Sequence, residues 1–224
     1  MGRRRRRSTK YEILQCATKL FLEKGYTMAY VTTIANALNI STGNLTFHFP
    51  TKEHILAELV NVLCEIQNRV DASAEPGEHT LLSEYLHELA MIASVCEENP
   101  NIKDLIMAVY SHPLSLEVIR KNDTKRSMQV YKEYCPEWTE ADYIRTENIV
   151  SGMEYAMLMT ENTEGISFEQ RVSGGMDAIM KLYDIPKETR QKVISDVMAS
   201  DYRSNGARVF EDFYSFVQDK IARA

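Results

Sequence analysis

Residues Val31–Phe49 have the sequence VTTIANALNISTGNLTFHF, which decides how the first part of the chain folds. Apolar residues recur in it at the spacing of two short helices separated by a tight turn. Asn39 lies at the turn, where a left-handed backbone is required and Asn tolerates it better than most residues. Ser41 or Thr42 is an acceptable N-cap for the second helix. The stretch therefore predicts a helix-turn-helix, with apolar positions at Ile34, Ala35, Leu38, Ile40 and Leu45.

The second of these helices presents polar and aromatic side chains away from its core residue, Leu45. Polar groups near the N-terminus of such a helix are what recognition of base edges in the major groove requires. The spacing by itself is also found in helical proteins that bind no DNA, so DNA binding is one of two interpretations at this point. The candidate DNA contacts are Thr33, Thr42, Gly43, Asn44, Thr46 and Phe47.

A predicted helix and a basic arm precede this stretch. Thr9–Glu12, TKYE, has the pattern of a capping box, with Thr9 as the N-cap of a helix that Gly25 is predicted to end. Before it stands a run of five arginines, either a solubilising tail or a flexible arm that binds phosphates or the minor groove. Its position before the helix-turn-helix favours the arm. These residues are Arg3, Arg4, Arg5, Arg6 and Arg7.

Between Ile13 and Leu56 the chain resembles the tetracycline-repressor (TetR) family of transcriptional regulators. The resemblance rests on ATKLFLEKGY at residues 17–26, IA at 34–35 and STGNLTFHFPTKE at 41–53. It implies a homodimer that binds a near-palindromic operator in double-stranded DNA and is released by a small-molecule effector. Most members of the family are repressors, so the resemblance implies repression.

The resemblance also assigns phosphate contacts to His48 and Lys52. Lys52 lies in the first turn of a predicted helix, where free backbone amides and a cation together favour a phosphate. Two features depart from the family pattern. No Thr or Ser stands near residues 29–30 to cap the next helix, and Thr46 stands where the family usually has Tyr. Both departures bear on the base contacts rather than on the fold.

After residue 51 the sequence predicts further amphipathic helices, with a linker over residues 71–80 and no strand. One helix is predicted over residues 116–134. Thr139 is predicted to cap another, and the capping box Ser167–Gln170 opens a third.

These elements predict an all-α protein with two domains. A three-helix helix-turn-helix DNA-binding domain occupies residues 1–50, with the arm at residues 1–8. A larger helical domain at residues 51–224 binds the effector and dimerises, as the resemblance implies.

Small residues on two helices of the second domain allow another helix to approach closely. The resemblance implies that these helices form a two-fold dimer interface, and packing inside the domain is the alternative. The interface residues are Gly152, Ala156, Ser173 and Gly174. Aromatic and methionine side chains of the same domain are candidates for the effector site, although such residues are more often core. They are Tyr85, Met107, Tyr110, Tyr155 and Met159.

Charge is distributed unevenly along the 224 residues. Residues 1–60 hold nine Lys and Arg against four Asp and Glu, whereas residues 61–224 hold 17 against 28. This asymmetry suits a chain whose first quarter meets a polyanion. The acidic balance of the rest favours a cationic effector, but it equally fits any cytosolic protein.

No catalytic or cofactor motif emerges from the sequence, so we expect no enzyme, no cofactor and no metal site. The four cysteines lie far apart, which suggests reduced thiols in the cytoplasm. The longest apolar run has six residues, too short for a membrane helix, and no secretory signal is present. The leading hypothesis is a transcriptional regulator. The alternative is a helical ligand-carrier or interaction protein without specific DNA binding.

Overall fold

The structure is a computed structural model that describes residues 9–73, 80–160 and 165–223. Within these residues the chain forms eleven α-helices and no strand, which confirms the predicted all-α class. The helices are α1 (Thr9–Met28), α2 (Val31–Ala37), α3 (Thr42–His48), α4 (Lys52–Ser73), α5 (Leu81–Glu98), α6 (Pro100–Ser111), α7 (Pro113–Val130), α8 (Glu140–Met159), α9 (Phe168–Leu182), α10 (Lys187–Ala199) and α11 (Tyr202–Arg223).

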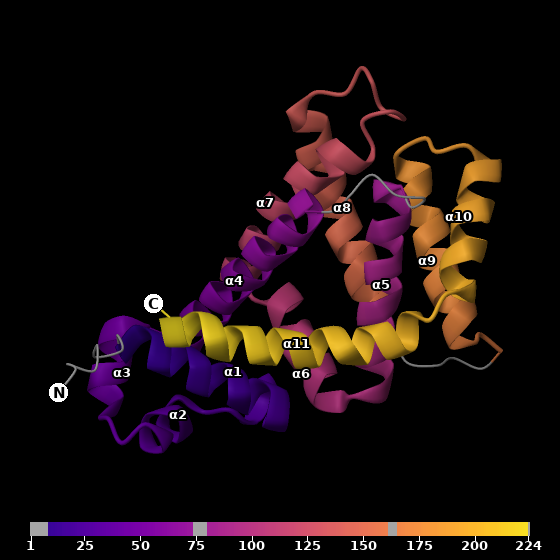
Figure 1. Cartoon of the computed structure of the whole chain (residues 1–224). Helices are drawn as coiled ribbons and strands as arrows, with labels where there is room; N and C mark the ends of the chain where they lie inside the picture. Colours follow the sequence, from indigo (N-terminus) through magenta and orange to yellow (C-terminus); the bar gives the residue numbers. More distant parts are fainter. Residues whose placement is uncertain (1–8, 74–79, 161–164, 224) are drawn as a thin grey trace.

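The helices form a head and a rear part (Figure 1). The head consists of α1, α2, α3 and the first turns of α4, and the rear part contains α5, α8, α9 and α10. Helices α4 and α7 pack against each other between the two parts, and α6 packs against α1. The last helix, α11, runs back across α5 and α1, so its C-terminal end lies beside the head (Figure 1). The sequence did not indicate this return of the chain.

Each part has its own cluster of buried apolar side chains. The head cluster surrounds fully buried Ile13, Phe21, Ile34 and Leu45, and it extends to α4 and α6. The rear cluster joins α5, α8, α9 and α10. Because the head cluster includes residues of α4 and α6, the head packs as one body with the helices that lead away from it. The predicted domain boundary at residue 50 stays a prediction.

Four predicted boundaries differ from the structure. Thr9 is already the first residue of α1, so it is not the N-cap. Gly25 has the expected positive φ of 79°, but it only kinks α1, which continues to Met28. The helix predicted over residues 116–134 begins earlier, at Pro113, because a proline at the first helical position loses no hydrogen bond.

The predicted linker at residues 71–80 is also shorter than expected. Helix α4 continues to Ser73, and residues 74–79 lie outside the described part of the chain.

Close to the kink at Gly25, hydrogen bonds join α1 of the head to α6. A Cβ added at Gly25 would lie 2.6 Å from the Asp104 Oδ2 atom, and the positive φ also disfavours other residues there. The Asp104 carboxylate accepts hydrogen bonds from the Thr27 backbone N at 2.7 Å and from the Thr27 Oγ1 at 2.6 Å. Asn101 donates to the Glu23 backbone O at 2.8 Å. Hydrogen bonds therefore connect α6 directly to the end of α1.

Candidate functional site

Helix α3 is held in one orientation and exposes most of its remaining side chains. Its N-cap is Ser41, whose Oγ accepts a hydrogen bond from the Asn44 backbone N at 3.1 Å. Leu45 is fully buried in the head cluster and fixes the rotation of the helix. Phe47 is 84 % exposed, which is unusual for a phenylalanine and is typical of a contact surface. The predicted contacts that are exposed are Thr42, Gly43, Asn44 and Phe47.

The turn before α3 has the predicted geometry. Asn39 has a φ of 53°, in the left-handed region. Tyr30 is the N-cap of α2 and makes no capping hydrogen bond through its side chain, which confirms that this helix lacks a cap. Thr33 and Thr46 are half-buried, and the Thr46 Oγ1 donates to the Gly43 backbone O at 3.2 Å. These two threonines therefore present less surface than the residues at the start of α3.

The two predicted phosphate contacts have partners within the head. His48 is half-buried, and its ring packs edge-on against Phe47 with centroids 5.3 Å apart. The Lys52 Nζ donates to the Tyr26 backbone O at 2.9 Å and lies 4.0 Å from the centroid of the Tyr26 ring. Burial lowers the pKa of Lys52, and the charges of Glu53 and Asp104 oppose that shift. Since an ammonium has three N–H groups, two remain for a phosphate.

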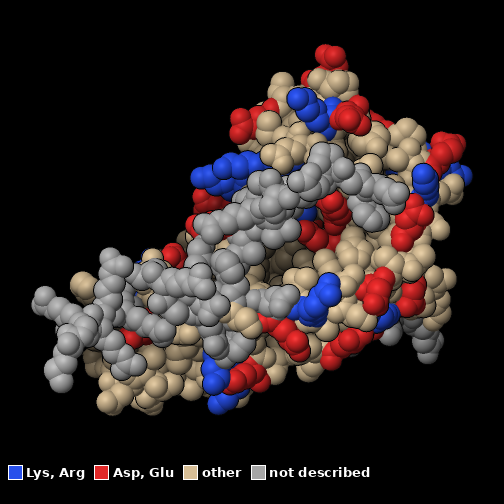
Figure 2. Space-filling view, in the orientation of Figure 1, with Lys and Arg blue, Asp and Glu red and all other residues tan. Residues whose placement is uncertain are grey.

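No charged side chain belongs to the helix-turn-helix itself. Residues 25–51 contain no Asp, Glu, Lys or Arg, and the surface over α2 at the lower left of Figure 2 is accordingly almost free of charged side chains. Contacts to bases and phosphates in this stretch must come from hydroxyl, amide and backbone groups. The charge that attracts DNA must come from its flanks.

Residues 13–59 match the family described as bacterial regulatory proteins of the tetR family. This part of the chain is a TetR-family N-terminal domain. The matched residues include α2, α3 and the first turns of α4, which are the elements that present the exposed face of α3.

Solved and curated proteins add little to this assignment. TylP, described as a TetR regulator from Streptomyces fradiae, is similar to this chain with a TM-score of 0.46 and 16 % identity, over 85 % of this chain and 100 % of TylP. A likeness of that size says nothing of the ligand or assembly of this chain. No curated protein matches the sequence.

In the rear part of the chain, two of the predicted effector residues meet at a buried carboxyl. Tyr85 of α5 donates to the Glu154 Oε1 at 2.7 Å, and Tyr110 of α6 donates to the Glu154 Oε2 at 3.0 Å. Tyr155 packs against Tyr110 with ring centroids 6.4 Å apart. Met159 is half-buried against the rear cluster, whereas Met107 is 37 % exposed and does not belong to that cluster.

Glu154 is one of three carboxyls that the sequence analysis did not single out. We call Asp123, Glu147 and Glu154 the acidic cluster. Glu147 accepts a short hydrogen bond from the Tyr183 hydroxyl. Burial, followed by the charge of Glu154, raises the pKa of Glu147 to about 7, although the bond from Tyr183 opposes the shift.

A sequence signal for two of these carboxyls exists. Residues 143, 147, 150, 154 and 157 follow the interval pattern of one helix face, and its apolar members are Tyr143, Val150 and Met157. Glu147 and Glu154 therefore occupy core positions of α8, and the structure buries both. A carboxylate at such a position is the kind of exception that indicates a functional site.

The predicted dimer residues lie mostly on the surface of α8 and α9. Gly152, Ala156 and Gly174 are exposed and Ser173 is half-buried. A Cβ added at Gly152 or Gly174 would meet nothing within 4 Å, so packing inside the protomer does not require glycine there. Ile144 and Ile149, on the same helix as Gly152, are about half exposed at 47 % and 53 %.

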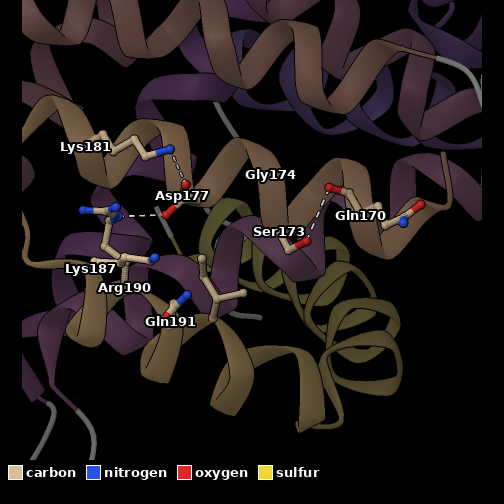
Figure 3. A pocket seen from close by; sticks show the side chains of 9 residues that line it. Gln170, Ser173, Gly174, Asp177, Lys181, Lys187, Arg190 and Gln191 are labelled. Atoms are coloured by element: carbon tan, nitrogen blue, oxygen red, sulfur yellow. Dashed lines mark hydrogen bonds and ion pairs between the residues drawn. The ribbon is translucent and has the colours of Figure 1, made fainter.

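A groove of about 710 Å³ lies between α9 and α10, beside this surface (Figure 3). Ser173 and Gly174 line it, and so does Asp177. Asp177 forms ion pairs with Lys181 at 2.6 Å and with Arg190 at 2.7 Å. Three of the charged side chains that line the groove are thus paired with one another.

Three remaining predictions concern the arm, the membrane and the cysteines. The arginines at residues 3–7 lie outside the described residues, so their DNA contacts stay a prediction. None of the described helices has the length and apolar character needed to cross a membrane. All four cysteines are free thiols, and burial raises the pKa of each.

Proposed function

We propose that this TetR-family chain is a homodimeric repressor that binds a near-palindromic operator and leaves it when a small-molecule effector binds the rear part. The single observation that carries the proposal is the exposed face of α3 within the matched residues 13–59. Thr42, Asn44 and Phe47 are exposed and stand where a helix-turn-helix enters the major groove.

A duplex-binding assay tests this proposal. A set of duplexes that covers the promoter of the protein's own gene is titrated with the full-length protein at low ionic strength. Asn44→Ala is expected to weaken binding to the preferred duplex and to relax its sequence preference. Gln129→Ala, an exposed amide on α7 of the rear part, serves as the matched control and leaves binding unchanged. Equal affinity for every duplex would overturn the proposal.

The dimer is supported by the surface of α8 and α9. Ile149, Gly152 and Ala156 recur at helical spacing on an exposed face of α8, and open glycines permit close approach of a second helix. Ala156→Arg is expected to convert a dimer to a monomer in sedimentation experiments, while Ser195→Arg on exposed α10 does not. An unchanged dimer in the first variant excludes this face as the interface.

Release by an effector is supported by hydrogen bonds that connect α6 both to the head and to the rear part. One end carries Asp104, bonded to Thr27 of the head, and the other carries Tyr110, bonded to Glu154 of the rear part. A ligand that displaces Tyr110 shifts the helix that holds the head, which biases the protein between two conformers with different DNA affinity. Asp104→Ala is expected to diminish the effect of an effector on DNA affinity.

The helical ligand-carrier without specific DNA binding remains the competing function. One observation favours it, namely the absence of charged residues from residues 25–51. The duplex titration distinguishes the two, because a carrier of this kind binds ligands in the rear part but shows no preference among duplexes.

A further inference from the structure

The acidic cluster brings three carboxyl groups together in the rear part. Glu147 and Glu154 are 3 % and 5 % exposed, and none of the three carboxyls forms an ion pair with a cation of the described residues. Arg126 lies close enough to oppose the pKa shifts of Asp123 and Glu154, but it is itself paired with Glu88 at 2.5 Å. Burial raises the pKa of all three carboxyls. Buried carboxyls of like charge are costly unless a proton or a cation joins them.

A second, independent observation at the same place is an unpartnered tyrosine hydroxyl. Tyr131 is 1 % exposed, and its Oη has no hydrogen-bond partner among the described residues. The Tyr131 ring lies against Tyr183, whose hydroxyl bonds Glu147, and against Tyr85, whose hydroxyl bonds Glu154. After burial, the charges of the same two glutamates are the largest causes that raise the pKa of Tyr131. A buried polar atom that has no hydrogen-bond partner among the described residues therefore lies beside the two glutamates, and leaving it unpaired is destabilising.

Aromatic rings surround the carboxyls. The Tyr131 ring stacks on Tyr183 at 3.7 Å and meets the Tyr85 ring edge-on at 6.0 Å. These rings belong to the rear cluster, against which partly buried methionines pack, among them Met128, Met153 and Met159. Ring faces attract organic cations, and methionine side chains adapt to apolar groups of different shape. Figure 2 shows a hollow near the middle of the molecule, with acidic side chains at part of its margin.

We propose that the acidic cluster binds the effector and that the effector is a hydrophobic organic cation, an onium group carried on an apolar body. This inference rests on the proposed function for the role of the ligand, but not for its chemical class. The onium group lies against Glu154 and Glu147 and supplies the missing positive charge, while the tyrosine rings and methionines hold the apolar body. A neutral or anionic ligand of the same shape would gain no electrostatic attraction from the carboxyls.

The same contacts connect the ligand to the head. An onium group against Glu154 competes with the hydroxyls of Tyr85 and Tyr110. Tyr110 belongs to α6, so the loss of its bond frees the helix that holds Thr27 through Asp104. Binding of a cation is thereby coupled to the position of the recognition helix.

Two probes of nearly equal shape and opposite charge test the ligand class. Tetraphenylphosphonium and tetraphenylborate are titrated into the full-length protein by calorimetry in the absence of DNA, with benzyltrimethylammonium as a smaller cation. At least one of the two cations is expected to bind. Tetraphenylborate is expected to bind at least 100-fold more weakly than that cation. If neither cation binds, or if the borate binds as tightly, the inference is overturned.

Isosteric variants test whether the cation binds at the acidic cluster. Glu154→Gln and Glu147→Gln are each expected to weaken cation binding at least tenfold, whereas Glu188→Gln on exposed α10 leaves it unchanged. Thermal melts confirm that each variant is folded, because an amide in the cluster removes a buried charge without changing shape. Cation binding that survives both buried substitutions contradicts the assignment of the site.

The outcome for the ligand is separable from the outcome for DNA. A protein that prefers certain duplexes but binds neither cation keeps the proposed function and loses this inference. A protein that binds a cation through Glu154 but prefers no duplex keeps the ligand class and loses the proposed function.

Discussion

The recognition helix and the acidic cluster are built in opposite ways. Helix α3 gathers its candidate contacts from seven consecutive residues, exposes them and leaves them uncharged. The acidic cluster and its tyrosine partners come from α5, α6, α7 and α8 and from the residues after α7 and α9, and its two glutamates are buried without a paired cation among the described residues. The difference shows that contact with a large polymer needs a local surface, whereas selection of a small ligand needs an enclosure made by distant segments.

The largest expected effect is on the free energy of unfolding and comes from the buried core of the head. Leu45 is fully buried beneath α3, so Leu45→Ala is expected to lower the free energy of unfolding by about 2–5 kcal/mol. Chemical denaturation followed by circular dichroism measures the change. Unaltered stability in this variant would mean that α3 is not packed as described.

A pH effect of similar size is expected from the rear part. The pKa of Glu147 is about 7 in the folded protein against 4.5 as the ordinary value. Since the folded state binds this proton more tightly, Glu147 lowers the stability as pH rises from 4.5 through 7, by about 3 kcal/mol in total. Glu147→Gln removes this loss, so the variant gains stability relative to the parent at pH 8 but not at pH 4. Denaturation curves at both pH values check it, and parallel pH profiles for the two proteins contradict it.

The third effect concerns the surface of the head. Phe47 is 84 % exposed, so Phe47→Ala is expected to leave the melting temperature nearly unchanged. It is expected to weaken binding to the preferred duplex by roughly 1–3 kcal/mol, about a factor of ten to a hundred. Fluorescence anisotropy on the preferred and a scrambled duplex measures both affinity and preference. A variant that binds both as before would remove Phe47 from the interface.

A smaller effect is expected at the proposed dimer face. Gly152→Ala is expected to stabilise the protomer by up to about 1 kcal/mol, because alanine favours a helix and its Cβ meets nothing there. The same methyl group is expected to weaken the dimer in sedimentation equilibrium. Gly206→Ala is the contrasting control, since its Cβ would meet the Met91 backbone O at 2.9 Å inside the protomer. A tighter dimer in Gly152→Ala would speak against this face.

The smallest effect is expected at Lys52, whose charge is partly used within the head. Lys52→Met keeps the aliphatic stem on the Tyr26 ring but removes the charge. It is expected to reduce the slope of log affinity against log salt by about 1 and to weaken all duplexes alike. Lys192→Met, exposed on α10, is the matched control. An unchanged slope would mean that Lys52 serves only to hold α4 against α1.

The sequence by itself determined what is local. The N-cap at Ser41, the left-handed Asn39 and the apolar spacing around Leu45 act over a few residues, so they predicted the helix-turn-helix and the all-α class. Helix ends were less certain, as at Gly25 and Pro113, because the backbone can kink or begin a helix at such residues according to its neighbours.

Only the tertiary structure decided the rest. No pattern within a helix shows that Tyr85 and Tyr110 share Glu154, that Asp104 fastens α6 to Thr27, or that α11 returns to the head. These contacts join residues 44 to 77 positions apart, or helices from opposite ends of the chain. Their partners are set by how whole helices pack, because burial depends on the surfaces that meet and not on the order of residues along one of them.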